Sequence, residues 1–295
     1  MTNLASQEKF ISVIAIFHNM RREAERTLYS LTTAYQTGAI NDRYEVIAID
    51  SNSTECLSSN LVQSFGNNFS YQKVTSKYPS PCIALNKGVE LARGNIVMCL
   101  IDGARILSPS IISKTLLAFE TFNNPFVYTI GLHLGPKIQN ISITEGYDKT
   151  VEDKLLDSVD WKINGYSLFN ISVLAGSNKG YNSKITESNC FSLYKKSYYQ
   201  IGGFDERFIS PGGGLANLDI FNRAMESESI DPVLLMGEGS FHQLHGGVAT
   251  NVQREIHPYK VFNEEYRNIK GQYFHSSFRP PHYFGDVSHE SKKFI

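Results

Sequence analysis

The sequence predicts an α/β protein: a doubly wound, mostly parallel mixed sheet with helices on both faces, in one large domain. Over the first hundred residues, apolar runs typical of strands alternate with segments of helical spacing. The stretch 96–101 is continuously apolar between Gly94 and Gly103, as expected of a strand buried on both faces. Because crossovers between neighbouring parallel strands are right-handed, this alternation favours one sheet wound in both directions.

The elements are expected where apolar runs meet breakers and capping residues. The first strand ends at His18-Asn19, Gly38 stops the helix that follows, and Ser108 with Pro109 opens a later helix. We expect strands at 10–17, 44–49, 69–74, 96–101, 125–132, 188–194 and 232–236. We expect helices at 21–36, 54–65, 79–92, 108–122, 151–159, 217–227 and 254–271.

Two stretches lack clear periodicity. Residues 133–188 are rich in polar residues and glycine, which is typical of a lid or an acceptor-binding insert. Residues 274–295 are expected to be a surface extension.

Composition excludes several functions. The chain of 295 residues has a formal charge of −1 and no arginine-rich stripe, so we expect no nucleic acid partner. The four cysteines are scattered, which disfavours a structural zinc site. With neither a signal layout nor an apolar run of bilayer length, we expect a cytoplasmic protein, and peripheral contact with the inner face of the membrane stays open.

Polar residues follow three of the expected strands: His18-Asn19, Asp50-Ser51 and Asp102. Ligands of open α/β sheets bind beyond the carboxyl ends of strands, so these residues are site candidates. Two of them have a structural alternative, since Asp102 could cap the next helix and the segment around Asp50 is rich in turn-forming residues.

Later segments add further candidates. Gly212–Gly214 could let the backbone approach a ligand, and Asn217 and Asp219 follow at a helix start, where acids are often structural. His242 and His245 lie on an expected loop and could supply nitrogen ligands to a metal that Asp102 also binds. Trp161 could stack on a sugar ring or pack the insert.

Taken together, these segments resemble the family 2 glycosyltransferases of the GT-A fold over about residues 10–250. The matching segments are the strand into His18-Asn19, the strand into 50–54, Leu85-Asn86 with Gly88, the strand into Asp102, 202–206 with 219–223, and the loop at His242.

The resemblance implies a nucleotide-sugar donor lying across the carboxyl edge of the sheet, with Mn²⁺ or Mg²⁺ at Asp102 and His242. The implied donor-binding residues are Ile16, Phe17, His18, Asn19, Asp50, Asn52, Asn86, Asp102, Gly103 and Arg105. The acceptor residues that we expect are Trp161, Gly213, Gly214 and His245. Residues 1–104 would form the nucleotide-sugar-binding half, 105–250 the acceptor-binding and catalytic half with the insert at 133–188, and 251–295 a C-terminal helix and extension.

Two departures from the family pattern stand out. The second acid of the family's Asp-x-Asp motif is Ala104, and the Glu-Asp pair that supplies the base in inverting members reads Ala216-Asn217. We therefore expect Asp219, beside Asn217, to act as base, and Arg105 to assist the metal at the donor phosphates.

The resemblance implies transfer of a sugar from a UDP- or GDP-sugar to a hydroxyl of a carbohydrate or glycoconjugate, with inversion, in polysaccharide or glycoconjugate synthesis. A catalytically degenerate nucleotide-sugar-binding module is the main alternative, because both departures remove chemistry. A nucleotidyltransferase would need a glycine-rich basic loop after the first strand, and 18–21 does not provide one. The chain also lacks the GxGxxG and GxxxxGK[ST] motifs.

Overall fold

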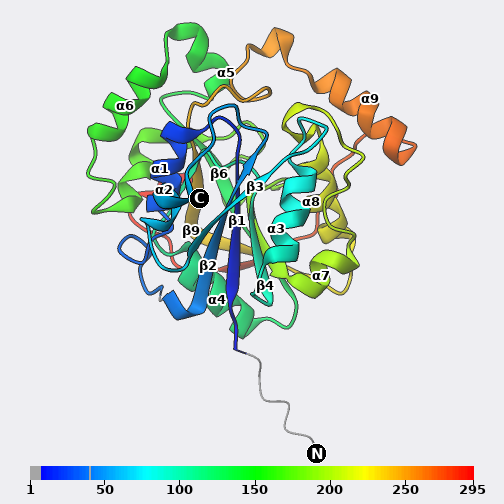
Figure 1. Ribbon diagram of the computed structural model, residues 1–295, viewed down its shortest axis with the longest axis horizontal. Coiled ribbons are helices and arrows are strands. Elements are labelled where there is room, and N and C mark those ends of the chain that lie inside the picture. The colour runs from blue at the N-terminus through cyan, green and yellow to red at the C-terminus, as the bar shows by residue number, and fades with distance from the viewer. Residues whose placement is uncertain (1–7, 40) are drawn as a thin grey trace, which may run out of the picture.

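The structure is a computed structural model that describes residues 8–39 and 41–295, and its central feature is a ten-stranded mixed sheet (Figure 1). The strands are β1 Ile11–Phe17, β2 Tyr44–Ser51, β3 Phe69–Val74, β4 Ile96–Leu100, β5 Arg105–Leu107, β6 Pro125–Leu134, β7 Ser172–Leu174, β8 Cys190–Tyr194, β9 Asp231–His242 and β10 His282–Phe284. Their order is β10-β9-β6-β8-β4-β1-β2-β3, while β5 pairs with β9 and β7 with β6.

The sheet is mostly parallel along this order, as the sequence predicts. Strands β4, β1, β2 and β3 are parallel neighbours, and so are β6, β9 and β10. Strand β8 runs antiparallel between β4 and β6. The amino end of β8 therefore lies at the same edge of the sheet as the carboxyl end of β4.

The α-helices are α1 Arg21–Tyr29, α2 Ser59–Gln63, α3 Cys82–Leu91, α4 Ile111–Thr121, α5 Gln139–Ser142, α6 Lys149–Asp157, α7 Lys195–Gln200, α8 Ala216–Glu226 and α9 Tyr259–Lys270. Short 3₁₀ helices are η1 Asn41–Arg43, η2 Ile143–Glu145, η3 Gly165–Ile171, η4 Pro211–Gly213, η5 Arg254–Ile256 and η6 Ser291–Phe294.

Two helices begin or end away from the predicted residues for local reasons. Helix α1 stops at Tyr29, well before 36, and the Gln36 side chain donates to the Ser30 carbonyl (2.7 Å) within the turns that follow. Helix α4 begins at Ile111 because the Ser108 hydroxyl, expected to cap it, donates to the buried carboxylate of Glu238 instead.

Helices cover both faces of the sheet, and each face has its own apolar core. Figure 1 shows α3 and α8 on one side of the sheet and α1 and α2 on the other. Along β1, Ile14 and Ile16 belong to the core under α3 and α8, while Val13 and Ala15 belong to the other. This burial on both faces explains why β1 reads as a continuous apolar run.

Strands β5 and β7 are not among the predicted elements, and two other strands differ from the sequence prediction. Strand β9 extends to His242, so this histidine ends a strand instead of lying on a loop. Strand β10, in the segment expected to be an extension, pairs with β9 at 233–235. The insert contains the helix predicted at 151–159, here α6, which is held to α1 because Asp153 accepts from the guanidinium of Arg22 (2.6 Å).

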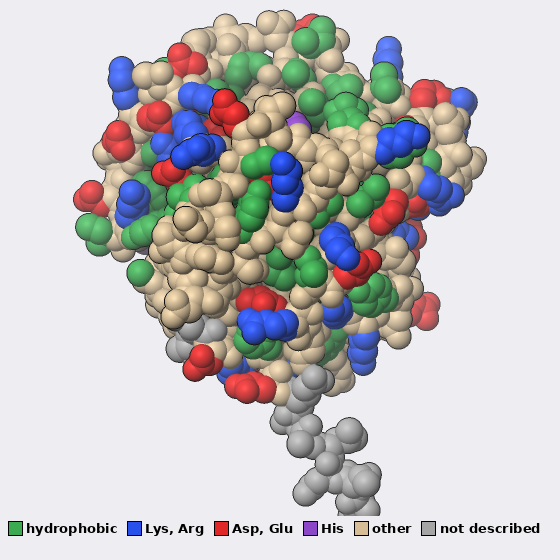
Figure 2. Space-filling model, in the orientation of Figure 1, with side chains coloured by type: hydrophobic (Ala, Val, Ile, Leu, Met, Phe, Trp, Pro, Cys, Tyr) green, Lys and Arg blue, Asp and Glu red, His purple; other side chains and the backbone are tan. Residues whose placement is uncertain are grey.

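Charged side chains form no single-sign field on the face that Figure 2 shows, where basic and acidic residues are interspersed. Over residues 8–39 and 41–295, no helix combines the length and apolar character needed to cross a bilayer.

Candidate active site

A cavity of about 720 Å³ opens at the carboxyl ends of the parallel strands, a volume typical of small-molecule sites. The loops that follow β1, β2 and β4 form one wall, which contains Ile16, His18, Asn19, Ser51, Asn52, Ile101 and Asp102. The lining also contains Glu187, Asn189, Gly212, Gly214, Leu215, Asn217, Leu218, His245, Val248, Tyr259 and Phe262. The three polar strand exits identified in the sequence therefore converge on one cavity.

Two asparagines hold the strand-exit loops together. Asn19 and Asn52 have positive φ angles of 52° and 56°, a conformation that asparagine tolerates better than most residues. The Asn19 side-chain oxygen accepts from the Thr54 amide (2.9 Å), and Asn52 accepts from the Ser76 amide (2.9 Å) and donates to the Tyr78 carbonyl (3.1 Å). The polar groups of Asn19 and Asn52 hydrogen-bond to the backbone of the neighbouring loops, so these side chains fix the shape of the cavity wall.

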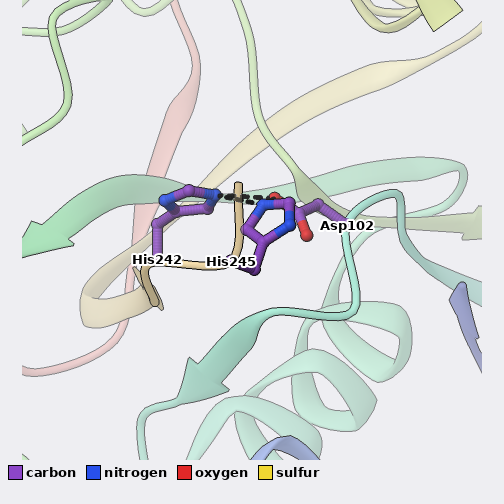
Figure 3. A group of neighbouring side chains, drawn as sticks. All are labelled: Asp102, His242 and His245. Atoms are coloured by element: carbon purple, nitrogen blue, oxygen red, sulfur yellow. Dashed lines mark hydrogen bonds and ion pairs between the residues drawn. The ribbon is translucent and has the colours of Figure 1, made fainter. Parts of the chain in front are cut away.

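At the base of this wall, Asp102, His242 and His245 form a compact cluster (Figure 3). The Oδ2 atom of Asp102 lies 2.8 Å from Nε2 of His242 and 3.4 Å from Nε2 of His245. One ligand atom from each of the three lies within 4.8 Å of the others. Asp102 and His242 thus face one another, and His245, expected at the acceptor, joins them.

Gln139 fixes the orientation of His242. Its Oε1 atom lies 2.6 Å from Nδ1 of His242, so Nδ1 carries the proton and Nε2 presents a lone pair toward Asp102. The Gln139 amide nitrogen also donates to the His242 carbonyl (3.0 Å), and Asn251 donates to Gln139 Oε1 (2.9 Å). A partner on the second ring nitrogen is characteristic of metal-binding histidines.

The charge states of Asp102 and His242 suit a divalent cation, whereas at His245 a proton competes with the metal. Burial lowers the pKa of His242 to about 4, so this imidazole is neutral at neutral pH. Burial alone would raise the pKa of Asp102, but His245 and His242 together hold it well below its usual value. For His245, the Asp102 carboxylate outweighs burial and raises the pKa. One anionic oxygen and two imidazoles can bind Mn²⁺ and similar ions.

Arg105 places a cation on the floor of the cavity. Strand β5 pairs with β9 so that Arg105 lies opposite His242, and only 3% of the Arg105 surface is exposed. Its Nη1 atom is 3.5 Å from the Ser240 hydroxyl, and its Nε finds no hydrogen-bond partner within the described part of the chain. Burial lowers its pKa, while Asp102 and Glu187 favour the charged form.

The residues between Asp102 and Arg105 are structural. Gly103 donates to the Ile16 carbonyl (2.7 Å), and a Cβ at this position would lie 2.4 Å from that oxygen, so only glycine fits. Ala104 is fully buried in the apolar core beneath α1, and its amide donates to Asp102 Oδ1 (3.0 Å). The side chain of residue 104, where the family motif has its second acid, therefore faces apolar side chains.

Four residues expected to contact the donor lie outside the cavity lining: Gly103, described above, and Phe17, Asn86 and Asp50. Phe17 packs in the apolar core, and both ends of the Asn86 amide are bonded to the chain near Phe204. Asp50 is 1% exposed, and its Oδ2 accepts from the Leu57 amide (2.7 Å). Its Oδ1 lacks a hydrogen-bond partner among the described residues.

Asp219, the residue expected to act as base, also lies outside the cavity lining. Asp219 is 2% exposed and lies outside the cavity, because its carboxylate is paired with Arg223 (2.8 Å) and Lys270 (3.0 Å). This pairing assigns Asp219 to the packing of α8 against α9. Asn217 does line the cavity; its amide donates to the Asn189 side chain (3.3 Å).

Two of the expected acceptor residues do not fit that role. Trp161 is buried, with its ring 5.7 Å from that of Tyr29 and 5.9 Å from that of Tyr35, so it packs the insert against α1. Gly213 is buried against Pro81, whereas Gly214 lines the cavity.

Glu187, Asn189 and Gln139 are site residues that the sequence analysis missed. Glu187 and Asn189 precede β8, which begins at the cavity edge because it runs antiparallel to β4. The antiparallel direction of β8 is the signal that would have placed them in the site. Gln139 lies in the stretch without periodicity, which gave no signal for it.

A family model described as "Glycosyltransferase like family 2" matches residues 12–232. The chain therefore belongs to this family of glycosyltransferases.

Among solved structures, the chain is similar to S. aureus TarS, which shows the same fold. It matches TarS with a TM-score of 0.53 and 12% identity, covering 80% of this chain and 37% of that one. It matches TarS 1-349 in complex with UDP with a TM-score of 0.51 and 13% identity, covering 80% of this chain and 60% of that one. It matches TarS 1-349 in complex with UDP-GlcNAc with a TM-score of 0.55 and 14% identity, covering 88% of this chain and 65% of that one. The chain thus spans less than two thirds of each TarS chain. A search of curated proteins gave no match.

Proposed function

We propose that this glycosyltransferase moves a sugar from a nucleoside-diphosphate-sugar to an acceptor hydroxyl with inversion. The observation that carries the proposal is the Asp102–His242–His245 cluster at the base of a cavity of about 720 Å³, at the ligand-binding edge of the sheet. A departing diphosphate needs positive charge close to it, and this cluster is suited to hold that charge.

Asp102, His242 and His245 would hold a divalent cation, Mn²⁺ or Mg²⁺. When bound, such an ion neutralises charge on the leaving diphosphate. Arg105 supports the same task, because its buried guanidinium lines the cavity with a free donor. The loops at His18-Asn19 and Ser51-Asn52 would enclose the nucleotide, with Asp50 behind them.

The TarS complexes with UDP and UDP-GlcNAc make a UDP-sugar the first donor to test, with a GDP-sugar as the alternative. The acceptor would be a carbohydrate or glycoconjugate, in polysaccharide or glycoconjugate synthesis. The division into a donor half (1–104), an acceptor half (105–250) and a C-terminal part (251–295) belongs to the same proposal.

Calorimetry tests the metal-dependent donor site. UDP and GDP are titrated into the protein with Mn²⁺ and, separately, with EDTA. We expect Mn²⁺ to increase the affinity for one nucleotide, and His242→Ala to abolish this increase while the exposed His289→Ala does not. Equal affinity with and without Mn²⁺ in the unsubstituted protein would refute the metal site.

A nucleotide-sugar-binding module without catalysis is the second candidate, and Asn217 at the family's base position favours it. Measuring the release of UDP from a UDP-sugar distinguishes the enzyme from the binding module. An enzyme slowly releases UDP from a UDP-sugar because water replaces the acceptor, whereas a binding module holds the donor intact.

A further inference from the structure

Among the described residues, only two carboxylates line the cavity, those of Asp102 and Glu187. Asp102 is engaged by two imidazoles. The Glu187 carboxylate has neither a hydrogen bond nor an ion pair within residues 8–39 and 41–295, and its side chain is half-buried. A partly buried acid with no structural partner, in a cavity built for a ligand, is a candidate for chemistry.

The fold brings Glu187 to the same edge as Asp102. The Ile101 amide donates to the Asn189 carbonyl (3.3 Å), which ties the chain beside Asp102 to the chain just after Glu187. Arg105 lies within the electrostatic reach of both carboxylates. Glu187 therefore lies in the cavity lining at the same edge of the sheet as Asp102.

Asn217 occupies the position where inverting relatives carry their base, and an amide cannot take a proton from a hydroxyl. The Asn217 side chain donates to Asn189, two residues from Glu187, and its Oδ1 is buried without a partner among the described residues. The free carboxylate and the position that lost its acid thus share one wall of the cavity.

The three histidines that line the cavity outside the Asp102–His242–His245 cluster are poorer bases. In His133 and His257 the Nδ1 atom accepts a backbone amide, so Nε2 carries the proton and neither nitrogen is free to take another. In His18, Nδ1 donates to the Ser51 carbonyl (2.7 Å) and Nε2 lies 3.5 Å from the Asn19 side-chain nitrogen, so both ring nitrogens are engaged in the strand-exit loops.

We propose that Glu187 is the catalytic base, and this inference rests on the proposed function. The Glu187 carboxylate takes the proton of the acceptor hydroxyl while the hydroxyl oxygen forms a bond to the anomeric carbon. The bond from that carbon to the diphosphate oxygen breaks, and its electron pair leaves with the diphosphate. The base function has thus moved from position 217 to position 187.

The test uses the full chain with Mn²⁺ and UDP-GlcNAc, other UDP- and GDP-sugars serving as donors if this one is inert. Release of the nucleotide is measured for the unsubstituted protein, for Glu187→Gln and for Glu228→Gln, a matched change at an exposed acid between α8 and β9. Since a positioned base contributes about a hundred- to ten-thousand-fold, we expect Glu187→Gln to lower kcat by that factor.

Three further readouts separate a base from a structural residue. Affinity for UDP with Mn²⁺, measured by calorimetry, and the thermal midpoint should not change in Glu187→Gln, and Glu187→Asp should recover part of the turnover. Full turnover in Glu187→Gln, or loss of turnover in His18→Gln alone, would overturn the inference. If the unsubstituted protein neither binds nor cleaves any of the donors, the proposed function itself fails.

Discussion

Replacing Ala104 with aspartate restores the second acid of the Asp-x-Asp motif, and we expect it to destabilise the protein without improving metal binding. The Ala104 side chain is fully buried in the apolar core beneath α1, with Phe17 and Leu28 in the same cluster. A carboxylate at this position would face hydrocarbon, away from the Asp102–His242–His245 cluster.

The size of the effect follows from the protonation of the new carboxyl. Burial raises its pKa, so at pH 7 it stays protonated in the folded chain, whereas in the unfolded chain it ionises with a pKa of about 3.9. Keeping it protonated three pH units above that value costs about 4 kcal/mol at about 1.4 kcal/mol per unit. That is a large share of the roughly 5–15 kcal/mol that stabilises an ordinary domain.

Urea denaturation of Ala104→Asp and Ala104→Asn at several pH values is the assay. The amide has the same shape, so the difference between the two variants isolates the effect of ionisation. Because the folded state binds the proton more tightly, the penalty of the aspartate variant grows as pH rises above about 4 and nearly vanishes below it. Wild-type stability at pH 7, or tighter Mn²⁺ binding by Ala104→Asp, would refute this placement of residue 104.

Three further changes probe other contacts. Gln139→Leu should weaken Mn²⁺ binding about ten- to a hundred-fold in competition titrations, because the imidazole that it orients becomes free to rotate; unchanged affinity would deny Gln139 this role. Asp219→Asn should lose about 1–3 kcal/mol in urea denaturation, since Lys270 loses its charged partner, while nucleotide release by the folded protein persists; the opposite pattern would restore Asp219 as base. Hydrogen bonds from Arg207 and an ion pair with Lys270 lower the pKa of Asp205, so its stabilising effect is present above about pH 4 and is lost as pH falls. Asp205→Asn should therefore be less stable than the unsubstituted protein at neutral pH but equal to it in strong acid, and a gap independent of pH would contradict this.

The strand exits were predictable from sequence because parallel strands place their carboxyl ends at one edge. Two apolar runs ending at His18 and Asp102 were enough to bring those residues to one cavity. The same logic failed for Glu187, because it precedes a strand and only the antiparallel direction of β8 brings it to that edge.

Side-chain partners were harder to predict than strands. Asp219 carried the signature of a family acid, but its role depends on Lys270, which lies about fifty residues further on and packs from α9. Gln139 lies in a segment without hydrophobic periodicity, so no pattern indicated that its side chain would hydrogen-bond to His242. Burial of Ala104 depends on the packing of β5 against α1, a tertiary contact that no local sequence pattern indicates.

The two edges of β9 determine how firmly the strand that carries His242 is held. One edge pairs with β6, and the other is shared by β10 at 233–235 and β5 at 240–242. Between them, Gly237 has a φ of +74°, and a Cβ there would lie 2.0 Å from the Asp286 carbonyl. Residues 282–286 thus pack along the strand that carries His242. We therefore expect the amide hydrogens of β9 and β10 to exchange with deuterium as one cooperative unit.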